Sequence, residues 1–126
     1  MLDHIGLGVT DYGAGKEFYT KALAPLDYTP IWESPAEDGI GGHAGFGAGE
    51  KPDFWIGQGM PAPGLHVAFL AKSRAAVDAF YKAAIAAGGR DNGKPGLRPH
   101  YHENYYAAFV FDAGGHNIEA VCYNPE

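Results

Sequence analysis

The chain contains an internal repeat. The segment HIGLGVTDYGAGKEFYTKAL begins at His4, and the similar segment HVAFLAKSRAAVDAFYKAAI begins at His66. In each segment the histidine is followed 14 residues later by a Phe-Tyr pair, Phe18-Tyr19 in the first and Phe80-Tyr81 in the second. A repeat that keeps one register over this length indicates a supersecondary unit that is built twice.

Each half is predicted to begin with a strand and a helix. Alternation places His4 and its small neighbours on one face of the first strand, and His66 has the same position in the second half. Small neighbours leave room around both imidazoles, which suits a cavity lining better than a packed core. Thr10 or Asp11 is expected to cap the first helix, and Ser73 the second.

Short strands are predicted to complete each half. In the first half they are expected around 28–33, 43–46 and 53–56, and in the second around 89–93, 105–112 and 117–123. The sequence DAGG at 112–115 predicts a tight hairpin turn before the last strand. The chain is therefore predicted to be a single α+β domain of two β-α-β-β-β units, residues 1–58 and 64–126, with a Gly- and Pro-rich linker at 59–63.

The composition fits one globular domain without nucleic-acid or membrane partners. The 126 residues are 46% apolar and carry a net charge of −6, whereas binding to a phosphate backbone needs clustered Lys and Arg. No apolar stretch approaches the roughly 18 residues that a membrane helix needs. A single cysteine, Cys122, allows no intrachain disulfide, and the start MLDHIGLGV shows no targeting segment, so a cytoplasmic location is expected.

A lone carboxylate lies within the last predicted strand. Glu119 stands in the run GGHNIEAVCY, between Ile118 and Ala120. Such a charge faces either water or a cavity in which it holds something. For His4, His66 or Glu119 taken alone a structural or surface role is the simpler interpretation, but their related places in the two halves favour a shared site.

The duplicated unit resembles the vicinal-oxygen-chelate superfamily, the group of glyoxalase I, extradiol dioxygenases and bleomycin-resistance proteins. The resemblance covers essentially the whole chain and rests on LDHIGLGVTD, GLHVAFLA and YYAAFVFDAGGHNIEAV. It implies that the paired units form a curved mixed sheet around a pocket that contains a metal ion. It places metal ligands at His4, His66 and Glu119, and it places the fourth ligand position at Trp55, whose indole cannot bind a metal.

Two imidazoles and one carboxylate are the composition of a facial triad. Such a set suits a divalent ion such as Fe2+, Mn2+, Zn2+ or Ni2+ and leaves coordination positions open for substrate oxygens. The resemblance therefore implies a metal-dependent enzyme acting on a small oxygenated molecule.

Two kinds of metal chemistry remain open. The three-ligand set is similar to that of extradiol dioxygenases, but these place a tyrosine upstream of the glutamate where this chain has Phe109. Glyoxalase I uses four ligands, and the scattered Lys51, Lys94, Arg90 and Arg98 form no cluster for a glutathione carboxylate. Lyase or isomerase chemistry and ring-cleaving dioxygenase chemistry are both retained.

The segment RPHYHENYY supplies candidate proton-transfer groups. It carries His100, His102 and Tyr105 shortly before the last hairpin, and imidazole and phenol groups near a metal can shuttle protons. The plainer interpretation is a polar loop whose tyrosines pack on the sheet edge. His43 and His116 lie in glycine-rich stretches and are expected to be surface residues.

An aromatic pocket lining is expected from Trp32, Trp55 and Phe109, which suits a small, partly apolar ligand. The alternative function is metal-free binding of a small molecule, as in bleomycin-resistance proteins, and Trp55 fits that alternative better than the two histidines and Glu119 do. The resemblance also implies a homodimer, in which units from one chain or from two chains form the site.

Overall fold

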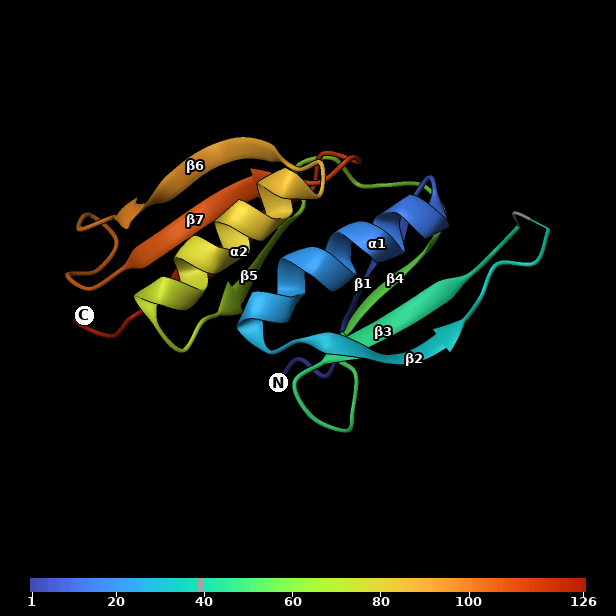
Figure 1. Cartoon of the computed structure of the whole chain (residues 1–126), viewed down its shortest axis with the longest axis horizontal. Helices are drawn as coiled ribbons and strands as arrows, with labels where there is room; N and C mark the ends of the chain where they lie inside the picture. Colours follow the sequence, from blue (N-terminus) through green and yellow to red (C-terminus); the bar gives the residue numbers. More distant parts are fainter. Residues whose placement is uncertain (39) are drawn as a thin grey trace.

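The computed structural model describes residues 1–38 and 40–126, and it has the predicted β-α-β-β-β order twice (Figure 1). The first unit contains β1 (Ile5–Val9), α1 (Tyr12–Leu23), the short 3-10 helix η1 (Ala24–Leu26), β2 (Thr29–Ser34), β3 (His43–Gly47) and β4 (Phe54–Gln58). The second contains β5 (His66–Leu70), α2 (Arg74–Ala86), β6 (Arg90–Leu97), β7 (Tyr106–Phe111) and β8 (Asn117–Cys122).

The strands form two mixed sheets with the same topology. Their orders are β1-β4-β3-β2 and β5-β8-β7-β6, and in each sheet the first and last strands of the unit pair in parallel while the other pairs are antiparallel. The registers also agree, since Gly6 pairs with Trp55 in β4 and Ala68 pairs with Glu119 in β8. The α+β fold prediction is confirmed, and Trp55 occupies the position in the first unit that Glu119 occupies in the second.

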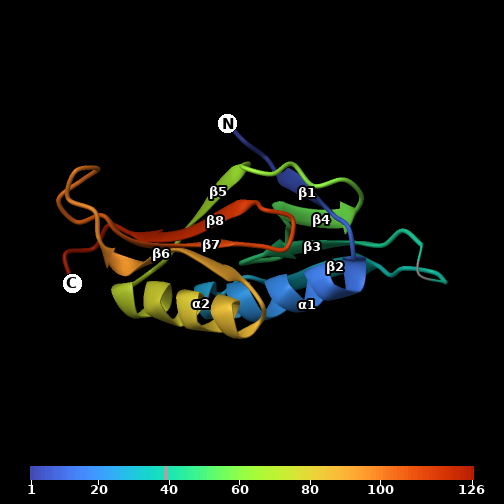
Figure 2. The same cartoon turned by 90° about the horizontal axis from the view of Figure 1, so that it is seen from above.

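Both helices cover the same side of the molecule. Figure 2 shows α1 and α2 beneath the strands, with the other faces of the sheets left uncovered on the opposite side. The helices pack against each other, and between the two sheets Phe54 of β4 packs edge to face on Phe69 of β5 with ring centroids 5.1 Å apart. We call the helix-free side of the two sheets the open face.

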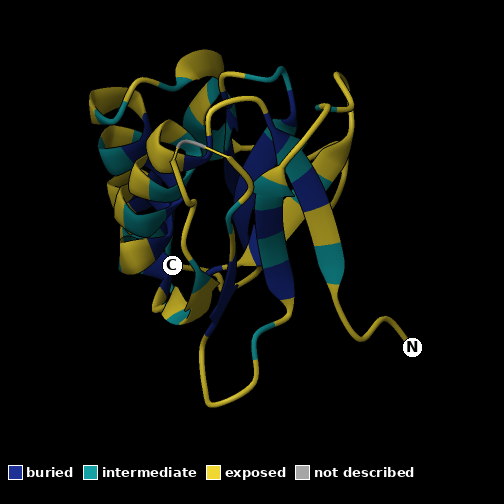
Figure 3. Ribbon diagram, turned by 90° about the vertical axis from the view of Figure 1, so that its right-hand side faces the viewer, coloured by how far each residue is buried: buried dark blue, intermediate teal, exposed yellow. Residues whose placement is uncertain are grey.

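The core lies between the helices and the sheets because strand residues alternate between the two sides (Figure 3). The large side chains buried there are mostly aromatic or branched and come from both units: Tyr19, Leu23, Phe46, Phe54, Ile56, Val77, Phe80, Val110 and Ile118. The Phe-Tyr pairs of the repeat are part of this arrangement, with Phe80 fully buried and Tyr81 packed at the edge of the core. The repeat therefore specifies mainly the helix-facing side.

The helix boundaries follow the predicted capping residues. Asp11 accepts a hydrogen bond from the Ala14 N–H at 3.0 Å, and Ser73 accepts one from the Ala76 N–H at the same distance. Gly88, just after α2, has a positive φ of 107°, a conformation that glycine adopts without strain at a helix end. No helix in the described part of the chain is long and apolar enough to span a membrane.

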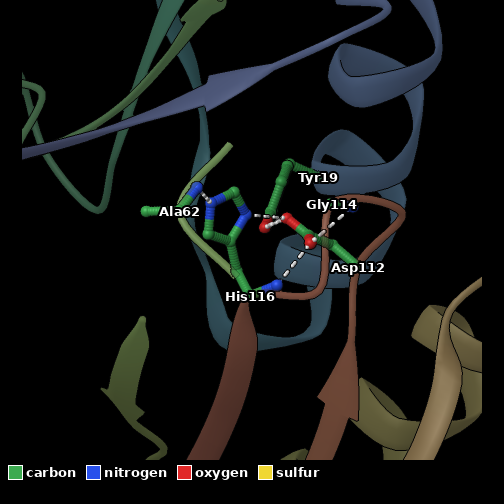
Figure 4. Close-up of polar contacts among 5 residues, drawn as sticks. All are labelled: Tyr19, Ala62, Asp112, Gly114 and His116. Carbon is green, nitrogen blue, oxygen red and sulfur yellow. Dashed lines mark hydrogen bonds and ion pairs between the residues drawn. The ribbon is translucent and has the colours of Figure 1, made fainter. Parts of the chain in front are cut away.

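The prediction that His116 is a surface residue is wrong. Its side chain is fully buried, and its Nδ1 lies 2.7 Å from Asp112 Oδ2 while its Nε2 accepts the Ala62 N–H at 3.0 Å (Figure 4). Asp112 also accepts the Tyr19 hydroxyl, and burial together with this carboxylate raises the pKa of Tyr19 well above its ordinary value. The network joins α1, the linker and the β7–β8 turn, a set of partners that no local pattern reveals.

Candidate functional site

The centre of the candidate site is the carboxylate of Glu119, on the helix-free side of the second sheet. Neighbouring side chains cover it there. Glu119 lies in β8, paired with Ala68 of β5 and opposite Phe109 of β7, and only 1% of it is exposed. The His66 Nε2 lies 2.7 Å from Glu119 Oε1, and the Tyr105 hydroxyl donates a hydrogen bond to Oε2. Two side chains from other segments thus converge on one carboxylate.

The hydrogen bonds to Glu119 indicate which neighbouring atoms carry protons. A carboxylate only accepts hydrogen bonds, so an ionised Glu119 requires a proton on His66 Nε2. Burial, followed by the hydrogen bond to Glu119, raises the pKa of Tyr105 above its ordinary value, so the phenol remains a donor at neutral pH. The His66 side chain is 48% exposed, and it is the part of the cluster that a ligand can reach.

His4 does not join this cluster within one chain. Its Nδ1 lies 2.7 Å from Asp3 Oδ2, and Lys51 donates to the other Asp3 oxygen at 2.5 Å. Within residues 1–38 and 40–126 of a single chain, no three His, Cys, Asp or Glu side chains are grouped closely enough to hold a metal ion. The prediction that His4, His66 and Glu119 bind one ion therefore stays a prediction.

A metal fits the two residues that do meet, but they do not complete a site. An imidazole and a buried carboxylate 2.7 Å apart are donor types that divalent ions accept. Three protein ligands are the usual minimum for a catalytic ion, and one chain brings together two of the predicted donors.

The first unit presents aromatic rings where the second has acid–base groups. Trp32, His43 and Trp55 form an aromatic cluster of tilted rings on the open face, with centroids 5.0 Å apart for Trp32 and His43 and 5.7 Å for the two indoles. The Trp55 ring lies over Gly45, where an added Cβ would come within 2.9 Å of it. Beside it a hollow of ≈ 460 Å³ is lined by Asp3, His4, Gly6, Lys51, Pro52 and Trp55.

The third predicted lining residue lies on the other sheet. The Phe109 ring is 6.2 Å from the His66 ring, so it borders the Glu119 cluster and not the indoles. The expected lining of Trp32, Trp55 and Phe109 is thus divided between the open faces of the two units.

The predicted proton-transfer residues are divided as well. Tyr105 contacts Glu119, but His100 packs against Tyr101 with ring centroids 4.2 Å apart, and His102 uses its Nδ1 to accept the Asn104 N–H at 3.0 Å. Both histidines are exposed in the β6–β7 loop. The structure brings only the tyrosine to the carboxylate.

Sequence comparison identifies the family. The match to the Glyoxalase/Bleomycin resistance protein/Dioxygenase superfamily extends over residues 1–120. The chain therefore belongs to this superfamily. No match was found among functionally curated proteins.

Solved structures share the fold. A glyoxalase/bleomycin resistance protein from Albidiferax ferrireducens T118 is 27% identical, with a TM-score of 0.74 over 97% of this chain and 98% of that one. A glyoxalase I variant from Zea mays is 19% identical, with a TM-score of 0.72 over 95% of this chain and 46% of that one. The fosfomycin resistance protein FosX from Listeria monocytogenes, solved with Mn(II) and 1S,2S-dihydroxypropylphosphonic acid, is 19% identical, with a TM-score of 0.66 over 96% of this chain and 88% of that one.

Proposed function

We propose that this protein is a divalent-metal-dependent enzyme that acts on a small oxygenated molecule. The observation that carries the proposal is the buried Glu119, which holds His66 and Tyr105 on the open face of the second sheet. A buried carboxylate is unfavourable unless it is paired, and a position that only had to complete a sheet would be filled by an apolar residue. Mn(II) in the structurally similar FosX supports a metal at this fold.

The metal site of the proposal is shared between two copies of the chain. His66 and Glu119 come from one protomer and His4 from its partner, because one chain does not group the three. The open face also exposes large apolar side chains, with 71% of Leu70 and 48% of Trp32 accessible. A homodimer that covers part of this face would bury such groups and complete the site.

Each residue has a defined role in this site. A bound divalent ion would supply Lewis acidity toward substrate oxygens. Tyr105 holds Glu119 Oε2, and a bound ion would replace the proton between His66 Nε2 and Glu119 Oε1. Phe109 provides an apolar wall next to them.

Metal titration tests the proposal. Tag-free protein is expected to bind about one Mn2+ or Zn2+ per chain by isothermal titration calorimetry, and His4→Ala, His66→Ala and Glu119→Ala are each expected to abolish binding, since a three-ligand site has no spare donor. Trp55→Ala, at the equivalent position of the first unit, is the matched control and should retain the ion. Unchanged binding in any of the three variants would overturn the ligand assignment.

Mixed dimers test the sharing between chains. His4→Ala and Glu119→Ala chains, each inactive in metal binding alone, are expected to regain one intact site per mixed dimer when they are refolded together. If the site lies within one chain, mixing restores nothing. A monomer at working concentration that still binds the ion would likewise contradict the shared site.

The alternative function is metal-free binding of a planar molecule. It is favoured by the aromatic cluster of Trp32, His43 and Trp55, because indole faces bind flat ligands well. Quenching of tryptophan fluorescence by planar aromatic compounds, together with no metal uptake by the wild-type protein, would support it.

A further inference from the structure

Arg98 brings a positive charge to the open face of the second unit. It follows β6 directly, and its N–H donates to the Tyr105 carbonyl at 2.7 Å, which closes the β6–β7 loop. Arg98 and Tyr105 are thus opposite each other across the ladder, and the Tyr105 hydroxyl reaches Glu119. The sequence offered Arg98 only as one of several scattered basic residues.

The Arg98 guanidinium has a fixed position. Its Cζ lies 5.4 Å from the centroid of the Phe109 ring, the same ring that borders His66. Its Nη1 donates to the carbonyls of Gly96 at 2.7 Å and Ala107 at 3.1 Å, and its Nη2 donates to the Lys94 carbonyl at 2.9 Å. The charged group is therefore held next to the Phe109 ring, which borders the Glu119 cluster.

Two glycines in the sequence GKPGLR make room for this position. A Cβ at Gly93 would lie 2.9 Å from Phe109 Cδ1 and 3.0 Å from Arg98 Nη2, and a Cβ at Gly96 would lie 3.2 Å from Arg98 Nη1. Glycine weakens a strand interior and often marks a close approach by another group. Here the approaching group is the guanidinium.

The charge of Arg98 is not neutralised by a carboxylate in the described part of the chain. Its hydrogen bonds to protein groups all go to neutral backbone carbonyls, and they use three of the five guanidinium N–H groups. The remaining donors, on Nε and Nη2, have no protein acceptor among these residues. Because arginine remains charged, a fixed guanidinium with unused donors is a binding element for an anion.

We propose that Arg98 binds an anionic group of the substrate, a carboxylate or a phosphonate, so that this site selects small organic anions. The inference rests on the proposed function for the location of the site, but it does not require a bound metal. Arg98 would hold the anionic group over the Phe109 ring while the rest of the molecule reaches His66 and Glu119. Arg98 is in this sense a specificity-determining residue.

Titration with matched probes tests this assignment. Benzoate and phenylphosphonate are added to metal-free 15N-labelled protein, with benzamide as the neutral counterpart of benzoate. At least one anion is expected to shift the Arg98 Nε–H signal, and Arg98→Ala should weaken its binding by at least about tenfold, since a charge-assisted hydrogen bond is lost. Arg98→Lys, which keeps the charge without the planar fork, should weaken it less than Arg98→Ala does.

Arg90→Ala is the matched control. Arg90 stacks on Phe111 with a Cζ-to-centroid distance of 5.2 Å in the same sheet, but it is exposed and lies at the other end of β6. Its removal should leave anion affinity within about twofold of wild type, as expected for an exposed charge. An equal loss in Arg90→Ala, equal affinity for benzamide, or no shift of the Arg98 signal by either anion up to about 10 mM, the range of weak binding, would overturn the inference.

The readout on wild-type protein keeps the test decisive even if Arg98→Ala does not fold, since the Arg98 signal either responds to anions or does not. The two proposals also fail separately. A protein that binds no divalent ion overturns the proposed function, and a protein that binds no anion at Arg98 overturns this inference.

Discussion

The two units of the molecule have the same backbone topology but carry different side chains on their open faces. Gly6 pairs with Trp55 in the first sheet as Ala68 pairs with Glu119 in the second, and the residues opposite them in β3 and β7 are Gly45 and Phe109. In one unit an indole lies over a glycine, and in the other a phenyl ring borders a paired carboxylate. The helix-facing sides are filled by the same kinds of apolar residues in both units. The comparison teaches that the duplicated fold constrains the covered side, whereas the open side is free to diverge into an aromatic surface and a polar site.

The largest expected effect tests the buried polar network around Asp112, which lies in the second unit and reaches Tyr19 of the first. Asp112→Ala should lower the free energy of unfolding by about 4 kcal/mol, because the Tyr19 hydroxyl, the His116 imidazole and two backbone N–H groups lose their acceptor. Urea denaturation followed by circular dichroism measures the change.

The first unit offers a matched control for this variant. Tyr28 donates to Asp53 at 3.0 Å in an exposed Tyr-Asp pair, and the desolvation of Tyr28 and this carboxylate raise the pKa of the phenol to about 12. Asp53→Ala should leave the denaturation midpoint nearly unchanged. Equal midpoints for the two variants would show that the buried network contributes no more than a surface pair.

A smaller effect is expected from the glycine under Trp55. Gly45→Ala should destabilise the protein by about 2 kcal/mol, because the new methyl group would overlap the indole and Pro52. It should also change the tryptophan emission spectrum, since Trp55 has to move. Gly49→Ala is the control, because no atom lies within 4 Å of its added Cβ. An unchanged spectrum and stability in Gly45→Ala would mean that the aromatic cluster around Trp55 accommodates the methyl group without cost.

A slightly smaller loss of stability is expected when Tyr105, the hydrogen-bond donor to Glu119, is changed. Tyr105→Phe should destabilise the protein by about 1.5 kcal/mol, since Glu119 Oε2 loses its donor and stays buried. Thermal unfolding at neutral pH measures it. Tyr101→Phe provides the comparison, because Tyr101 is 63% exposed. If the two variants behave alike, the hydrogen bond to Glu119 contributes nothing to stability.

The smallest effects should be the same in both units. Asp11→Ala and Ser73→Ala each remove one helix N-cap and should each lower the free energy of unfolding by about 1 kcal/mol. A large difference between them, measured by urea denaturation, would show that the equivalence of the units does not extend to the helix starts.

The sequence alone determined the fold, its duplication and the alignment of the two halves. The capping residues and the strand alternation are local signals, because helix and strand periodicity depends on neighbours along the chain. The constant offset between His4 and His66 showed that these signals occur twice. The resemblance also aligned Trp55 with Glu119, and the structure gives these residues equivalent positions, opposite Gly6 and Ala68.

Only the tertiary structure decided which side chains meet. It joined Glu119 to His66 and Tyr105, separated His4 from them within one chain, buried His116 against Asp112, and placed Arg98 on Phe109. These contacts depend on how the two units and the β6–β7 loop pack, and residues far apart in sequence are brought together by the burial of apolar surface. No periodicity along the chain encodes that convergence, because it arises from the summed packing of many side chains and not from any one pattern.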